Sequence, residues 1–106
     1  MEIKIKAIHF DATEKLQQFI TKKVEKLGKH NEEIASAEVT LKVVKPESAM
    51  NKEAAIRLEM PQRDDLFAGK TADTFEEAID LSVDALKRQL EKAKDKYPFD
   101  IPLTGP

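Results

Sequence analysis

Residues Lys70–Tyr97, KTADTFEEAIDLSVDALKRQLEKAKDKY, decide the fold of this 106-residue chain because they predict one long amphipathic helix. Thr74 is a suitable N-cap, since its hydroxyl can accept a bond from a free N–H group, and Glu77 completes a capping box. Pro98 favours an end at Tyr97 because it biases the preceding residue away from helical dihedrals. The apolar residues recur at spacings of three and four and therefore share one face: Phe75, Ile79, Val83, Leu86, Leu90, Ala93 and Tyr97.

Charge is distributed unevenly along this predicted helix. Acidic residues dominate its first half and basic residues its second, which is favourable for the helix dipole. Arg88, Lys92 and Lys96 follow one another at intervals of four and form a stripe of like charge. Such a stripe costs roughly a few tenths of a kcal/mol per pair in an isolated helix. Most charged helix faces are simply solvated, but an anionic partner would offset this repulsion.

A second helix is predicted over residues 14–28. Either Asp11 or Thr13 is a suitable N-cap, and Gly28 is the expected end. Its apolar face consists of Leu16, Ile20, Val24 and Leu27.

Lysines dominate the opposite face of this helix. Residues 14–30 contain five lysines and two glutamates. Lys22, Lys26 and Lys29 lie within about 60° of one another on a helical wheel. Lys23 lies nearer the apolar border, where its stem can cover apolar surface while its ammonium stays in water. Two separate cationic stripes, one on each helix, indicate an anionic partner more strongly than either stripe alone.

Alternation of apolar and polar residues predicts strands over residues 2–8, 37–44 and 53–60, with a shorter strand over 66–70. The last strand contains Gly69, which favours an end of the strand pairing. The residues expected to face the core are Ile3, Ile5, Ala7, Ala37, Val39, Leu41, Val43, Ala54, Ile56, Leu58 and Met60.

The predicted order is therefore β-α-β-β-β-α, an α+β fold. Because each strand alternates, only one face of the sheet needs to be covered, and both helices are expected on that face. The three later strands can pair as a meander with short connections. We expect one domain over residues 1–97, followed by a flexible C-terminal tail over residues 98–106 that contains three prolines.

The composition argues against an enzyme. The chain has no cysteine and two histidines, and His9 and His30 are interpreted as surface or loop residues rather than ligands. No Gly-rich phosphate loop is present, and no serine has a nucleophile-elbow context. We therefore predict no catalytic residue, metal, cofactor or small-molecule substrate. The absence of cysteines and of a long apolar run predicts a cytoplasmic protein with no membrane partner.

A family resemblance rests on three blocks of the second half of the chain. These are Ala68-Gly69-Lys70, the segment DTFEEAID at residues 73–80, and LKRQL at residues 86–90 with the lysines that follow. The first helix fits as well. The sequence resembles the ribosome hibernation promoting factor family, also called ribosome-associated inhibitors or sigma-54 modulation proteins, from residue 1 to about residue 97. The resemblance implies the same element order and a fold similar to double-stranded RNA-binding domains.

The resemblance also implies a function. Family members bind the small ribosomal subunit and its rRNA in the channel that mRNA and tRNA use, and they silence ribosomes under stress or in stationary phase. The positions that match the basic contacts of the family are Lys23, Lys26, Lys29, Lys70, Arg88 and Lys92. The stripe argument alone adds Lys22, Lys87 and Lys96.

The chain resembles the short form of the family, which is expected to be a monomer off the ribosome. It departs from many members at His9-Phe10-Asp11, where they have a Gly-Arg-Asn type of sequence. Whether it promotes ribosome dimers or idles single ribosomes stays open.

An alternative of another class is a protein-interaction module without RNA. It would bind a regulator through the open sheet face, at Glu38, Thr40, Lys42, Arg57 and Glu59. Binding of RNA should depend steeply on salt, whereas binding of a protein through this face should not.

Overall fold

A computed structural model describes residues 1–45 and 49–96, with side chains described as far as Lys92. The predicted order is confirmed: β1 (Glu2–Ala7), α1 (Glu14–His30), β2 (Ser36–Val43), β3 (Lys52–Glu59), β4 (Leu66–Ala72) and α2 (Phe75–Lys96). Several expectations concern positions outside the described residues or side chains: the tail at 98–106, the helix end at Tyr97 and Pro98, and the side chains of Ala93 and Lys96.

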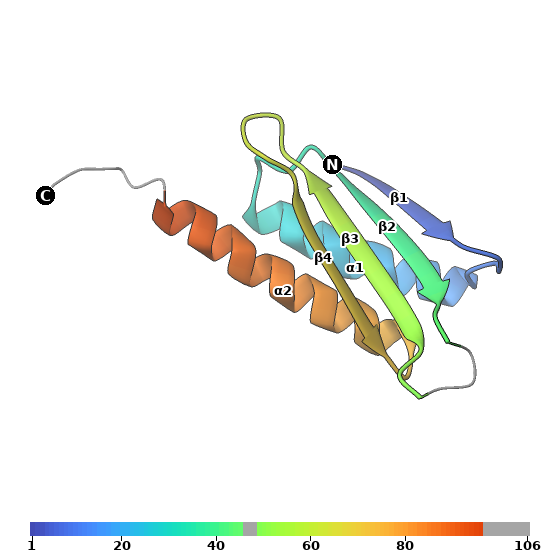
Figure 1. The fold of residues 1–106 in the computed structure, drawn as a ribbon. Helices are drawn as coiled ribbons and strands as arrows, with labels where there is room; N and C mark the ends of the chain where they lie inside the picture. The colour runs from blue at the N-terminus through green and yellow to red at the C-terminus, as the bar shows by residue number, and fades with distance from the viewer. Residues whose placement is uncertain (46–48, 97–106) are drawn as a thin grey trace, which may run out of the picture.

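The four strands form one sheet in the order β1-β2-β3-β4. β1 pairs with β2 in parallel, and the three later strands form the predicted antiparallel meander. Figure 1 shows both helices on the same face of this sheet, with α1 behind β1 to β3 and α2 along β4. The register aligns Ile5 with Val39, Val39 with Ile56, and Ile56 with Ala68, so one row of inward side chains crosses all four strands.

The core lies between the sheet and the helices, and it contains most of the residues that the alternation predicts. α1 contributes Leu16, Ile20, Val24 and Leu27, and α2 contributes Ala78, Ile79, Val83, Leu86 and Leu90. Val43 was expected to face the core but is 37% exposed at the end of β2, where it is the last residue of the strand. Ile3 and Ile5 are only partly buried, since β1 is an edge strand.

Threonines cap both helices. The N–H of Leu16 donates to Oγ1 of Thr13 over 3.1 Å, which selects Thr13 rather than Asp11 as the N-cap of α1. The N–H of Glu77 donates to Oγ1 of Thr74 over 3.1 Å, as predicted. These bonds satisfy N–H groups that a helix start otherwise leaves without a partner.

The expected end of α1 at Gly28 is wrong. The helix continues to His30 and is capped at Asn31, whose side-chain amide donates to the carbonyl of Leu27 over 3.0 Å. The missing side chain of Gly28 instead leaves room for the N-terminus. A Cβ atom at this position would lie 2.8 Å from Cε of Met1.

Two side-chain contacts connect α2 to the β1–α1 loop and to the edge strand β4. The rings of Phe10 and Phe75 stack with their centroids 5.1 Å apart, which joins the β1–α1 loop to the start of α2. On the other side, the side-chain amide of Gln89 donates to the carbonyl of Phe67 in the edge strand β4 over 2.9 Å. β4 is an edge strand, as Gly69 indicated, but it extends to Ala72.

Within the described part of the chain, no helix has the length and apolar character that crossing a membrane requires.

Candidate nucleic-acid interface

A groove between α1 and α2 brings three of the candidate cations together. It is lined by Lys23 and Lys26 from α1 and by Lys87 from α2. Asp80 and Asp84 of α2 lie in the same groove. The lysines come from two helices because Lys23 and Lys26 lie on the flank of α1 that faces α2, and Lys87 lies on the facing flank of α2. The groove is therefore rich in cations but not purely cationic.

Lys23 contacts two other residues of the protein, an acid and an aromatic ring. Its Nζ lies 3.1 Å from Oδ1 of Asp80, and it also lies over the ring of Phe19 at 5.6 Å from the centroid. Its side chain is half-buried, as the helical wheel predicted. The ammonium therefore lies in the groove between an acid of the other helix and an aromatic ring.

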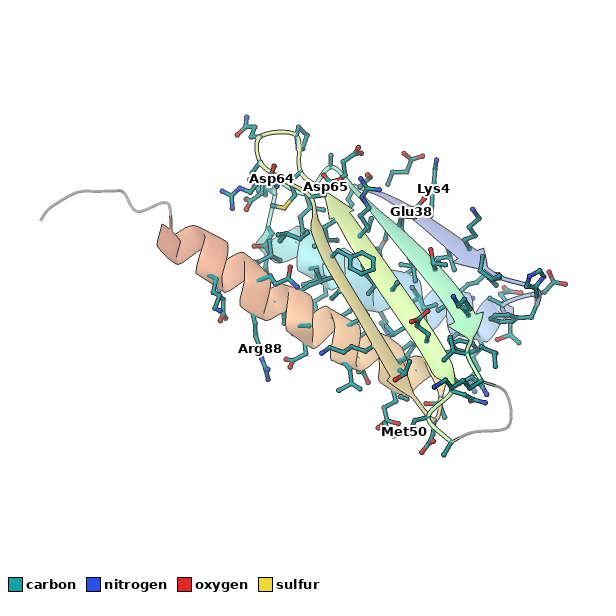
Figure 2. The ribbon with its side chains drawn as sticks, viewed as in Figure 1. Lys4, Glu38, Met50, Asp64, Asp65 and Arg88 are labelled. Atoms are coloured by element: carbon teal, nitrogen blue, oxygen red, sulfur yellow. The ribbon has the colours of Figure 1, made fainter. Side chains whose placement is uncertain are left out.

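Arg88 and Lys92 lie outside this groove. Nη2 of Arg88 is 3.0 Å from Oδ2 of Asp84, one helical turn earlier, and the arginine side chain is 79% exposed. Figure 2 shows it pointing away from the body of the protein. Lys92 is exposed one turn further along α2. Both side chains can reach a partner that approaches the outer side of the helix layer.

The remaining candidates are more widely spread. Lys22 lies on the outer flank of α1 near Glu14 and Glu25, away from the inter-helix groove. Lys29 is exposed in the last turn of α1. Lys70 is exposed on β4, where its register partner is the buried Ala54.

Lys96 is the last residue of α2, and its side chain is outside the described part. The candidate side chains that the structure describes are thus spread over the groove and the outer sides of both helices, and Lys70 lies on the adjacent edge strand β4.

Sequence reasoning missed the role of two acids. It assigned the acids in the first half of α2 to the helix dipole, whereas Asp80 and Asp84 contact candidate cations directly. The spacing of four between Asp84 and Arg88 was a usable signal for one pair. The pair of Lys23 with Asp80 joins two helices, so only their packing reveals it.

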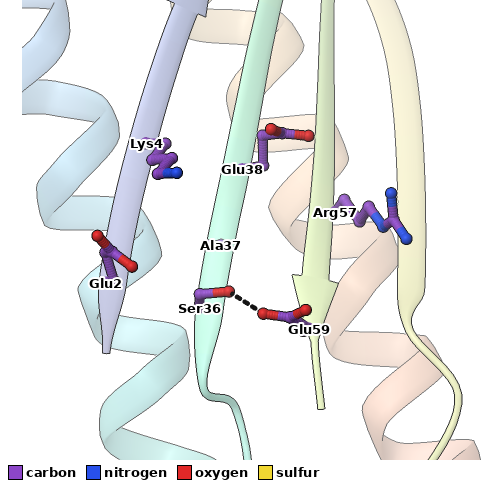
Figure 3. A pocket seen from close by; sticks show the side chains of 7 residues that line it. All are labelled: Glu2, Lys4, Ser36, Ala37, Glu38, Arg57 and Glu59. Atoms are coloured by element: carbon purple, nitrogen blue, oxygen red, sulfur yellow. Dashed lines mark hydrogen bonds between the residues drawn. The ribbon is translucent and has the colours of Figure 1, made fainter. Parts of the chain in front are cut away.

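The open face of the sheet has a different character. Figure 3 shows a hollow over its first three strands in which acidic and basic side chains alternate, with Ser36 donating to Glu59 over 2.9 Å. Arg57 donates from Nε and Nη2 to Oδ2 of Asp65 over 3.0 and 2.8 Å. This hydrogen bond and the charge of Asp65 raise the pKa of Arg57 above its ordinary value. The hollow therefore carries both acids and cations, and its arginine is paired with Asp65.

One large aromatic residue lies on the open face of the sheet. Phe67 on β4 is 60% exposed. Its ring lies 3.6 Å from the position that a Cβ atom on Gly69 would occupy. No group of three or more potential metal-ligating side chains occurs among the described residues.

A family model matches residues 3–97 of this chain, and its description is "Sigma 54 modulation protein / S30EA ribosomal protein". The chain belongs to this family. The match includes all of the strands and helices described above except Glu2, the first residue of β1, and the resemblance read from residues 68–90 is confirmed.

Curated relatives carry a name that agrees with this family. The chain is 27% identical over 96 residues to a protein of Pseudomonas putida named "Ribosome hibernation promoting factor", with 91% of this chain and 89% of that protein covered. It is 29% identical over 100 residues to a protein of Azotobacter vinelandii with the same name, with 91% and 85% covered.

Solved structures of low sequence identity share the fold. A ribosomal subunit interface protein from Coxiella burnetii matches with a TM-score of 0.79 and 21% identity, covering 90% of this chain and 99% of that chain. The N-terminal domain of Protein Y from Thermus thermophilus matches with a TM-score of 0.74 and 21% identity, covering 89% and 100%. The fold of this chain is therefore shared with a protein named as a ribosomal subunit interface protein and with the N-terminal domain of Protein Y.

Proposed function

We propose that this protein is a ribosome hibernation factor. It binds the rRNA of the small subunit in the mRNA and tRNA channel and inhibits translation in the cytoplasm under stress or in stationary phase. The observation that carries the proposal is the gathering of Lys23, Lys26 and Lys87 from two helices around one groove. The names of the curated relatives support the same function.

The arrangement suits a folded RNA. Lysine and arginine contacts to phosphates supply affinity and register, and folded RNA is recognised largely by shape. The helix layer presents cations in two places. Lys23 and Lys87 line the groove, and Arg88 and Lys92 lie on the outer side of α2. Binding of this kind requires no bond to be made or broken, so the function is that of an inhibitor by occupancy rather than an enzyme.

Occupancy of the channel makes inhibition depend on what the ribosome already holds. The protein should block initiation on empty small subunits, whereas ribosomes that carry mRNA and initiator tRNA beforehand should be protected. The test compares translation by empty and preloaded ribosomes at the same protein concentration, with sedimentation to measure the bound protein. Equal inhibition of both samples would contradict a site in the channel.

A further inference from the structure

Two of the cations proposed to contact RNA already have an acidic partner within the protein. Lys23 pairs with Asp80 over 3.1 Å, and Arg88 pairs with Asp84 over 3.0 Å. In both pairs the side chains are 43% or more exposed. Exposed pairs of this kind contribute little to stability. The small gain in stability therefore does not explain why two carboxylates, one helical turn apart, each contact a cation that is proposed to bind RNA.

We propose that Asp80 and Asp84 are specificity-determining residues of the RNA-binding surface. Each carboxylate is paired with one cation in the free protein, so a single RNA phosphate gains little binding energy by displacing it. Only an RNA that presents several phosphates in the matching arrangement displaces both carboxylates and gains the remaining contacts as well. The inference rests on the proposed function, in which small-subunit rRNA provides this arrangement.

The physical basis is an exchange of anions. A phosphate that reaches Lys23 replaces a carboxylate already at contact distance, so the net electrostatic gain is much smaller than for a solvated cation. An RNA that cannot place phosphates at both Lys23 and Arg88 therefore gains little, and such an exchange suppresses unsuitable partners more than it weakens the suitable one.

The charge of the whole chain leads to the same conclusion. Its formal net charge is −2, although its helix layer carries the cations described above. Non-specific binding to RNA is essentially electrostatic and would divert a strongly basic protein to any abundant RNA. The acids that contact the RNA-binding cations reduce non-specific binding to other RNAs at this surface.

The test uses the full chain with Asp80→Asn and Asp84→Asn combined, because asparagine removes each charge while preserving side-chain size. Two probes are compared: an RNA duplex of about 16 base pairs with no ribosomal sequence, and isolated small ribosomal subunits. The double variant should bind the duplex about threefold to thirtyfold more tightly, as expected when two exposed ion pairs no longer compete. The ratio of subunit affinity to duplex affinity should fall.

The salt dependence gives a second readout. A carboxylate that remains beside the bound phosphate partly offsets its neutralisation, so a paired cation releases fewer condensed counterions than an unpaired cation does. The double variant should therefore show a log–log salt slope for the duplex that is steeper by about 1 to 2.

A matched control distinguishes pairing from general repulsion. Glu76→Gln with Glu77→Gln removes the same charge from exposed positions at the start of the same helix, without touching either ion pair. This control should leave duplex affinity within about twofold, because its acids do not occupy the binding cations. In a chain that already carries Lys23→Gln and Arg88→Gln, the two asparagine substitutions should have no further effect.

An equal gain in the control, or a gain that persists without Lys23 and Arg88, would overturn the inference and leave only general repulsion. The duplex measurements decide this by themselves. Failure of the unaltered protein to bind small subunits would instead overturn the proposed function.

Discussion

Oγ of Ser82, a fully buried side chain on α2, donates a 2.9 Å hydrogen bond to the carbonyl of Ala54 on β3. This bond joins the long helix to the centre of the sheet through a polar atom that has no access to water. A buried hydroxyl is tolerated when it is hydrogen-bonded, and its partner depends on it in turn. The position of α2 over the sheet is therefore fixed by this directional contact, in addition to apolar packing and the bond from Gln89 to Phe67.

Ser82→Ala should destabilise the protein by about 1–3 kcal/mol, because it removes the donor and leaves the buried carbonyl less well satisfied. Denaturant melts of both proteins measure the difference. The control is Ser36→Ala, which removes a hydroxyl that bonds to Glu59 at the surface and should change stability by less than about 0.5 kcal/mol. Equal losses in both variants would mean that the buried bond contributes nothing beyond a surface bond.

Gly28→Ala should be neutral or should stabilise the protein by up to about 1 kcal/mol, since Gly28 lies inside α1 and alanine is the better helix former. The new methyl group meets the flexible end of Met1, which can move away. A melting experiment gives the sign. A loss of more than about 1 kcal/mol would show that Met1 cannot yield and that its contact with α1 is rigid.

Binding to small subunits should weaken steeply with salt. If about five phosphates are neutralised, the logarithm of the affinity should fall with the logarithm of the salt concentration with a slope of roughly −3 to −5. Equilibrium sedimentation or filter binding over a range of potassium concentrations measures it. A flat dependence would favour the alternative in which the mixed-charge sheet face binds a protein partner.

Arg88→Glu with Lys92→Glu should abolish association with small subunits while the protein stays folded. Both side chains are exposed on the outer side of α2, so packing is little affected, although acids near a helix C-terminus cost about 0.3–1 kcal/mol. Two attractive contacts become repulsive, which weakens binding far more than stability.

The control for this pair is Lys42→Glu, which changes charge in the same direction on the exposed sheet face. It should keep ribosome association. If the control lost binding while the helix variant retained it, the RNA-contacting surface would be the sheet. Co-sedimentation with small subunits and circular dichroism of each variant settle both parts.

The fold was largely predictable because its elements are amphipathic in a simple way. The alternation in residues 53–60 identifies the inward row of β3, since a strand places successive side chains on opposite faces. The parallel pairing of β1 with β2 is not a property of either strand alone and emerges only when α1 connects them. The end of α1 was wrongly predicted at Gly28 for a similar reason. The role of this glycine depends on its contact with Met1, which lies at the other end of the first β-α unit.

The candidate site was predictable only in part. The cationic stripes follow from spacing along each helix, so Lys26 and Arg88 could be found by counting residues. The groove that unites Lys23, Lys26 and Lys87 depends on how closely the two helices approach, which no local pattern specifies. The same is true of the contact between Lys23 and Asp80.

The bond from Gln89 to the carbonyl of Phe67 has a consequence for crowded solutions. An edge strand has unpaired backbone N–H and C=O groups, so a strand from a second molecule can pair with it, and repeated pairing of this kind leads to aggregation. Here a side chain of α2 already occupies one acceptor on the edge of β4. A neighbouring molecule would first have to displace this amide. The helix thereby opposes the growth of one sheet into the next when many copies accumulate.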